Sequence, residues 1–330
     1  MNAILSLIAV IALILIALLG VKTANLHSLF GIAVPYAAMA IFLIGVISRV
    51  LKWGRSPVPF CIPTTCGQQK SLPWIKQSKL DNPSTTSGVI GRMLLEVLLF
   101  RSLFSNTAFE LRNGPKVAYG STRWLWLGGL AFHWSFLVVL IRHLRLFTEP
   151  VPACLSSLEV LDGFLQIGAP GLLLSGVVLL LAVTYLFLRR VLIPEVRYIS
   201  LAADYFPLFL ILSIALSGII MRYFTKVDIV GVKALTLGLV SFNAVIPEGI
   251  SVVFYIHLFL VSALLAYIPF SKIMHLGGVL LSPTRNMPNN SRMERHINPW
   301  NYPVHVHTYE EYENDFREKM KSAGIPVEKE

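Results

Sequence analysis

Charged residues are scarce in this sequence: they make up 14% of its 330 residues, while hydrophobic residues make up 55%. A soluble domain usually carries about 25% charged residues. The formal net charge of +10 would suggest a nucleic-acid partner in a soluble protein, but most of the basic residues here flank long apolar runs. The composition therefore indicates a chain whose main solvent is the lipid bilayer, with no nucleic-acid partner.

Cysteines are also few, and the three present exclude a disulfide framework. Cys61 and Cys66 have a C-x₄-C spacing without the second pair typical of structural metal sites, which favours a structural or partner-contact role. Cys154 is expected to be inert. The sequence has neither a glycine-rich phosphate loop nor a nucleophile elbow, which leaves no sign of phosphoryl transfer or serine hydrolysis.

Six apolar runs are long enough to cross a hydrocarbon core of about 30 Å, and none alternates as a strand does. We therefore predict an all-α integral membrane protein with a six-helix transmembrane bundle. The predicted spans are residues 3–20, 31–51, 124–146, 168–188, 205–224 and 251–273. The first run lacks the basic start of a signal peptide, so we expect a retained helix, with a cleaved signal as the alternative. Residues 229–247 contain Lys233 and several polar residues, and we expect them to be interfacial or re-entrant.

The basic residues predict the orientation of the bundle. With the N-terminus inside, 21 Lys and Arg fall on the inner side and 6 on the outer side, and Arg49 ends the second span on the inner side. We therefore expect both termini on the cytoplasmic side of the cell's inner membrane. The predicted segments are a two-helix segment (1–51), a cytoplasmic loop (52–121), a four-span domain (122–282) and a cytoplasmic tail (283–330).

The two extramembrane segments are expected to differ. Within the loop, residues 88–104 are predicted to form an amphipathic helix on the membrane surface or against a partner. In it, Arg92 and Glu96 stand one helical turn apart and are expected to pair. The tail has no core pattern, so it is expected to be disordered or to fold on a partner.

Four of the eight histidines, His133, His143, His257 and His275, lie in or at the ends of the third and sixth spans. Ionisable groups at membrane depth are rare and usually functional. His133 and His143 are ten residues apart, about 15 Å along a helix. His257 and His275 are 18 residues apart, which is about five turns, so both face the same way.

The two spans run antiparallel, which sets the pairing of these histidines. His133 comes level with His275 toward the inner side, and His143 comes level with His257 toward the outer side. We predict that each pair supplies both axial ligands of one haem. Since both axial positions are then filled, electron transfer is expected rather than oxygen binding. Pro269 is expected to kink or end the last helix, so that His275 lies just past the regular span.

Two further residues are candidates for a quinol site. Glu248 lies nine residues before His257 and is a candidate proton acceptor for a quinol hydroxyl. Arg142 adjoins His143 and is a candidate partner for a haem propionate. Solvated interfacial charge is the alternative for both. The other histidines are not expected to be ligands: His27, His296, His305 and His307.

The histidine spacing over residues 120–280 resembles the nitrate reductase gamma-subunit type of cytochrome b. That resemblance implies two b haems, held by His133 with His275 and by His143 with His257. It also implies that the subunit exchanges electrons with menaquinol or menaquinone. Compared with that type, this chain has an additional N-terminal span.

The inner loop is similar to that of the DsrM type of membrane cytochrome b, from the sulfite-reduction-associated Dsr complex of sulfate respiration. The residues that carry this likeness are Pro63 to Ile75, the run Leu80-Asp81-Asn82-Pro83, and Leu95 to Phe104. The resemblance implies a cytoplasmic iron–sulfur partner of the heterodisulfide reductase type. It also implies a multihaem cytochrome c, a second iron–sulfur protein and a further membrane subunit.

These features predict an electron-transfer subunit of an oxidoreductase complex, which completes no substrate reaction alone. A heterodisulfide reductase-like, hydrogenase-type or formate dehydrogenase-type cytochrome b is the alternative within the redox class. Outside that class, a secondary transporter would need carboxylates at mid-span, and the spans carry Asp204 and Glu248 only at their ends. A non-redox membrane anchor would bind no haem.

Overall fold

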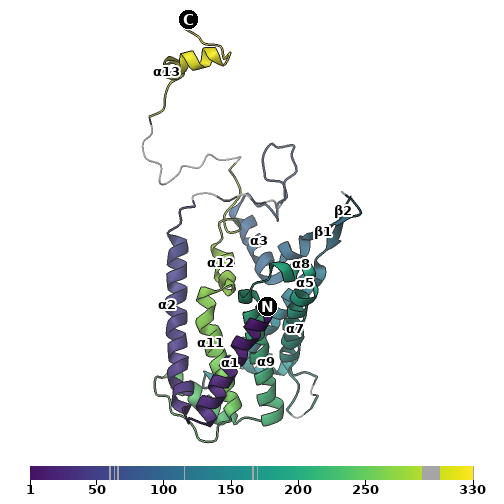
Figure 1. Ribbon diagram of the computed structural model, residues 1–330, viewed down its shortest axis with the longest axis vertical. Coiled ribbons are helices and arrows are strands. Elements are labelled where there is room, and N and C mark those ends of the chain that lie inside the picture. Colours follow the sequence, from purple (N-terminus) through teal and green to yellow (C-terminus); the bar gives the residue numbers. More distant parts are fainter. Residues whose placement is uncertain are drawn as a thin grey trace.

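The computed structural model describes residues 1–58, 61, 62, 64, 67–114, 116–165, 167, 168, 170–291 and 305–329. Six helices in these residues are long and apolar enough to cross a membrane, as predicted (Figure 1). Four of them combine an α-helix with an adjoining π or 3₁₀ segment. The spanning elements are α1 (Asn2–Lys22), η1 and α2 (Leu29–Ala33, Val34–Gly54), α5 and η2 (Arg123–His143, Leu144–Leu146), α7 (Leu174–Leu192), α9 and η3 (Ala202–Ile219, Ile220–Thr225), and α11 and η4 (Val252–Tyr267, Ile268–Phe270).

Two buried apolar clusters stabilise the bundle, and α1 contributes residues to both. Ala17 belongs to one cluster with residues of α10 and α11, while Val10 belongs to the other with Leu210 of α9 and Leu260 of α11. Helix α5 packs on α7, α7 on α9, and α2 on α11. The start of α1 is anchored by Ser6, whose hydroxyl donates to the Ala202 carbonyl oxygen at 2.9 Å. The first helix is thus packed into the bundle along its length.

Shorter helices also lie between and after the spans, among them α6 (Ala153–Asp162), α8 (Pro194–Ile199), α10 (Ile229–Val240) and α12 (His275–Leu281). Helix α10 is the segment with the ambiguous sequence pattern. Its 12 residues extend about 18 Å, too short to cross the bilayer core. Asp228 caps it by accepting hydrogen bonds from two backbone N–H groups. Because α10 does not cross, α9 and α11 run antiparallel, as the histidine pairing requires.

The loop after α2 contains a feature that the sequence interpretation missed. After α3 (Thr86–Leu99) and α4 (Arg101–Ser105), the chain forms an antiparallel hairpin of β1 (Thr107–Arg112) and β2 (Lys116–Ser121). At its turn, Asn113 and Gly114 have φ values of +30° and +89°. An Asn-Gly pair is a strong hairpin signal because both residues tolerate positive φ.

Helix α3 occupies the position predicted for an amphipathic helix, and its C-terminal end docks on α5. The indole N–H of Trp126 donates to the Leu99 carbonyl oxygen at 2.7 Å, and that of Trp134 donates to the Leu98 carbonyl oxygen at 3.0 Å. These bonds satisfy carbonyls that the end of a helix leaves without partners. They also tie the loop to the helix that carries His133 and His143.

The expected pair between Arg92 and Glu96 is not the one that forms. Glu96 instead pairs with Arg285 and accepts hydrogen bonds from the backbone N–H and the hydroxyl of Ser102, at 3.0 and 2.6 Å. Burial alone would raise the pKa of Glu96, but the bonds from Ser102 and the positive charge of Arg285 outweigh it, so the pKa is lowered. A nearby serine and an arginine 189 residues away therefore take the place of Arg92.

In the tail, α13 (Tyr309–Ser322) begins at a capping box, in which Thr308 and Glu311 bond to each other's backbone N–H groups. This helix forms within the chain, although the sequence predicted disorder or folding on a partner. Two residues considered in the sequence, Cys66 and His296, lie outside the described residues.

Candidate functional site

The four histidines come from three helices and meet as two pairs. His133 lies mid-way along α5, His143 is the last residue of α5, His257 lies in α11, and His275 is the first residue of α12. The ring centres of His133 and His275 are 5.9 Å apart, with planes at 82°. Those of His143 and His257 are 6.4 Å apart, with planes at 13°. The structure thus brings together the same rings that the sequence spacing brought level.

These separations suit two imidazoles bound to opposite sides of one metal. With metal–nitrogen bonds of about 2.0–2.1 Å, the bonded nitrogens lie roughly 4 Å apart and the ring centres about 6 Å apart. Among the described residues, α5 and α11 do not form a closely packed helix pair. The rings therefore meet across a wide gap between helices, as a planar macrocycle between them requires.

The Nδ1 atoms of three of the histidines are bonded to backbone carbonyl oxygens. A carbonyl only accepts, so each Nδ1 must carry the proton and each Nε2 is left with its lone pair. Such an outer hydrogen bond fixes the tautomer and orientation of a metal-binding histidine. The bonds run from His133 to Gly129 (2.7 Å), from His143 to Val139 (2.7 Å) and from His275 to Lys272 (2.9 Å).

The fourth histidine has a different partner, which the sequence did not reveal. Nδ1 of His257 lies 2.9 Å from the Ser217 hydroxyl of α9, and that hydroxyl donates to the Ile214 carbonyl at 3.0 Å. Because the hydroxyl hydrogen is directed to Ile214, its oxygen accepts from Nδ1–H. A Cβ added at the adjacent Gly218 would lie 3.5 Å from the His257 ring, so α9 closely supports this imidazole. Only the Ser-Gly pair in an apolar span hinted at this role.

Packing of the protein leaves the imidazoles largely uncovered. His133, His143 and His275 are exposed and His257 is half-buried, although the first three lie in or beside spanning helices. A polar ring at membrane depth needs a partner, because lipid offers it none. The donor set, its tautomers, its spacing and its exposure therefore all fit two haem groups held by histidine on both sides.

The helix break predicted at Pro269 is present. Helix α11 ends at Tyr267, and two 3₁₀ turns, η4 (Ile268–Phe270) and η5 (Lys272–Met274), lead to His275. Pro269 cannot continue a regular helix because it lacks an N–H group and its ring clashes with the preceding turn. The break lets His275 begin a new helix instead of extending the line of α11.

Phe100 supports the inner pair from the loop. Its ring packs edge-on against His133, with centres 4.9 Å apart, and it is the residue that joins α3 to α4. Its backbone is left-handed (φ +50°, ψ +46°), which is unusual for a bulky side chain. Strained conformations of this kind concentrate at functional sites.

Two arginines lie near the outer pair. Arg142 donates through Nη1 to Asp162 at 2.6 Å and to Ser175 at 3.1 Å. Arg222 donates to the Gly171 carbonyl at 3.2 Å, and it stands one turn after Gly218, which faces His257. Within the described residues, the Nε atoms of both arginines are buried without a hydrogen-bond partner. Arg142 already has one anionic partner, because it forms an ion pair with Asp162.

The remaining candidates lie apart from the histidine pairs. Glu248 is exposed in the turn before α11. His27 lies in the turn between α1 and η1, with its ring 5.3 Å from that of Tyr255. His305 and His307 lie together in the tail, where their ligand atoms and that of Glu311 come within 4.8 Å of one another. Cys154 is exposed at the start of α6.

Comparison with known proteins gives one family. Residues 118–287 match the nitrate reductase gamma subunit family. A protein of Archaeoglobus fulgidus, described as an Hdr-like menaquinol oxidoreductase cytochrome b-like subunit, is 48% identical over 279 residues, which is 82% of this chain and 83% of that protein. A protein of Archaeoglobus profundus with the same description is 46% identical over 275 residues, 81% of each chain.

Proposed function

Because this chain belongs to the nitrate reductase gamma subunit family, we propose that it is the membrane cytochrome b subunit of a menaquinol oxidoreductase complex, with two bis-histidine haems b. The observation that carries the proposal is the pairing of His133 with His275 and of His143 with His257, in each case with Nδ1 bonded and Nε2 free. A haem b at each pair supplies a one-electron carrier whose axial positions are both filled.

The chain's own groups hold and orient these carriers. The carbonyls of Gly129, Val139 and Lys272 and the hydroxyl of Ser217 keep each Nδ1 protonated, so each Nε2 would be the atom that binds a haem iron. The two pairs are separated by ten residues along α5, so haems held there would pass electrons from one to the other through the bundle. No open axial position remains for oxygen or substrate, so the subunit transfers electrons without completing a reaction of its own.

At the outer pair we propose that the arginines hold haem propionates. A propionate between Arg142 and Arg222 would accept from the two buried Nε atoms that otherwise have no partner. Glu248, exposed in the turn before α11, is proposed to accept a proton from menaquinol at this side. Menaquinone enters the proposal through the relatives, which are described as menaquinol oxidoreductase subunits.

More specifically, we propose that the chain is a subunit of the DsrM type, with both termini on the cytoplasmic face of the inner membrane. The quoted loop motifs support it, as does the position of the loop and tail at the same end of the bundle as α12, the helix that begins at His275 (Figure 1). A cytoplasmic iron–sulfur protein of the heterodisulfide reductase type would dock there. The multihaem cytochrome c and the further membrane subunit of such a complex belong to the same proposal.

Haem content tests the central claim. In purified protein, reduced-minus-oxidised spectra should give two low-spin b haems per chain, and His143→Ala should leave one. His27→Ala is the matched control, because His27 lies outside both pairs and should leave the count at two. A wild-type chain without haem would favour the membrane-anchor or transporter alternatives.

The quinol claim has a separate test. Glu248→Gln keeps the size of the side chain but removes the proton acceptor. It should slow haem reduction by a menaquinol analogue while leaving reduction by dithionite unchanged. Unaltered quinol-driven reduction in this variant would discard Glu248 as the acceptor without affecting the haem assignment.

A further inference from the structure

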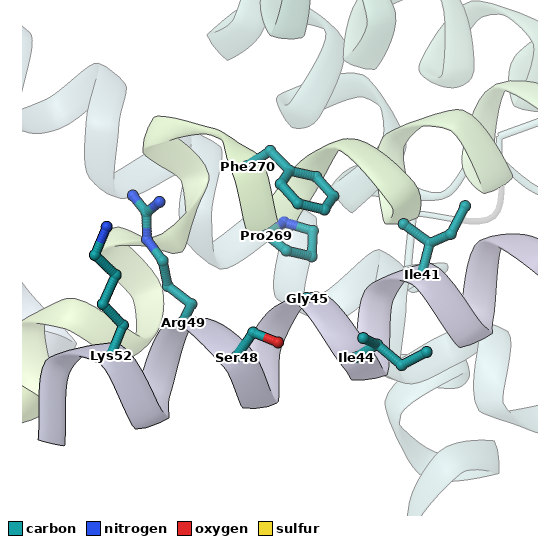
Figure 2. A pocket seen from close by; sticks show the side chains of 8 residues that line it. All are labelled: Ile41, Ile44, Gly45, Ser48, Arg49, Lys52, Pro269 and Phe270. Atoms are coloured by element: carbon teal, nitrogen blue, oxygen red, sulfur yellow. The ribbon is translucent and has the colours of Figure 1, made fainter. Parts of the chain in front are cut away.

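A groove of about 390 Å³ lies beside α2, and none of the four paired histidines lines it (Figure 2). It runs along α2 from Ile41 to Lys52, and its other wall is Pro269 and Phe270 of η4. A Cβ added at Gly45 would lie 2.5 Å from the Cβ of Pro269, so the Pro269 ring packs directly against the backbone of Gly45. The groove is therefore built where α11 ends against a glycine of α2.

The wall of the groove is apolar and open to the surrounding lipid. Ile44 and Phe270 are 67% and 69% exposed, and they lie on opposite sides of the contact between Gly45 and Pro269. The volume falls within the range of about 300–1,000 Å³ that is usual for sites of small ligands. A hydrocarbon chain is the occupant that such a surface takes within a bilayer.

The inner end of the groove is cationic. Arg49 and Lys52 stand one turn apart on α2, and both side chains extend to the same side of the helix (Figure 2). The Nε atom of Arg49 is buried without a hydrogen-bond partner, and no ion pair involves either residue within the described part of the chain. Four other basic residues at this end of the bundle have acidic partners: Arg101 with Asp81, Arg190 and Lys272 with Asp204, and Arg285 with Glu96.

We propose that this groove binds one anionic phospholipid. An acyl chain lies along Ile44 and Phe270, and the headgroup phosphate accepts hydrogen bonds from Arg49 and Lys52 at the membrane surface. Charge-assisted bonds to phosphate are strong, and the inner leaflet is the anionic one. A quinone is disfavoured here, because its neutral head gains little from two unpaired cations.

The position of the groove gives the lipid a structural consequence. Trp53, the next residue after Lys52, packs near Gly277 and Gly278 of α12, the helix that begins with His275. The guanidinium of Arg49 also lies 5.7 Å from the Trp53 ring centre. A phospholipid in the groove therefore braces the end of α2 that supports the inner histidine pair.

Native mass spectrometry of the delipidated full chain tests the proposal, with phosphatidylglycerol and phosphatidylcholine as probes. One phosphatidylglycerol should bind in preference to phosphatidylcholine. Arg49→Gln and Lys52→Gln should each weaken that binding roughly fivefold, the effect of removing one cation from an anionic surface. Arg55→Gln is the matched control, because Arg55 ends the same helix outside the groove and should leave the binding unchanged.

A second variant changes shape without changing charge. Ile44→Trp should fill the groove and expel the bound lipid with both cations in place, so the proposal stays testable if the charge variants fold poorly. Equal binding of the two lipids to the wild type, or full binding by the Arg49→Gln, Lys52→Gln double variant, would overturn it. Displacement of the lipid, one for one, by a menaquinone analogue would also overturn it and reassign the groove to quinone.

Discussion

Ser217 offers the sharpest test of the outer site, because its hydroxyl is the single side chain that bonds to a haem-ligating Nδ1 in this proposal. Ser217→Ala removes the acceptor 2.9 Å from Nδ1 of His257 and leaves the Nδ1–H without a partner. An Nδ1–H that donates makes the imidazole more electron-rich, which favours ferric iron. Loss of the bond should therefore raise the midpoint potential of the outer haem.

The size of this shift follows from the hydrogen bond. A typical bond contributes about 0.5–1.5 kcal/mol net. If most of that difference falls on the ferric form, the potential should rise by about 20–60 mV for a one-electron couple. The inner haem, whose histidines bond to backbone carbonyls, should not move.

Redox titration followed by visible spectroscopy measures both potentials, and His143→Ala identifies which signal belongs to the outer haem. Ser262→Ala is the matched control: Ser262 is a buried serine of α11 that bonds to its own helix at Leu258. An outer potential that stays fixed in Ser217→Ala, with two haems still bound, would refute the proposed role of this hydroxyl.

Two further predictions concern the ring planes of the two pairs and the residue beside His133. The rings of His133 and His275 are nearly perpendicular, whereas those of His143 and His257 are nearly parallel. The electron paramagnetic resonance spectrum of the oxidised protein should therefore contain one high-g signal and one rhombic signal. Two identical signals would contradict these ring planes. Phe100→Ala and Phe100→Gly both remove the ring beside His133, but only glycine relieves the left-handed backbone, so Phe100→Gly should be the more stable by about 1 kcal/mol in thermal unfolding. Equal stability of the two variants would show that the backbone stores no strain.

The spans and the pairing of the histidines follow from sequence because both depend on regular distances. Helix rise converts the spacing of His133 and His143 into depth, and antiparallel spans then set which rings come level. Pro269 acts through its own ring and missing N–H, so its effect is also local. Features that depend on one helix and its rise could therefore be predicted.

The features that were missed depend on contacts between distant segments. Ser217 lies 40 residues from His257 and Glu96 lies 189 residues from Arg285, so no local pattern indicates either pair. The Asn113-Gly114 turn is different, because its local signal was present within the predicted cytoplasmic loop but no hairpin was predicted from it. The partners of Ser217 and Glu96 were missed because they depend on tertiary contacts, and the hairpin was missed because its turn chemistry was not recognised.

The helix break at Pro269 gives His275 a different structural setting from that of the other three paired histidines. Three stand on long helices that the bundle holds firmly, whereas His275 begins a helix of seven residues reached through two short turns. A haem held by His133 and His275 would therefore depend on the position of one short helix, whereas a haem held by His143 and His257 would depend only on the packing of spanning helices.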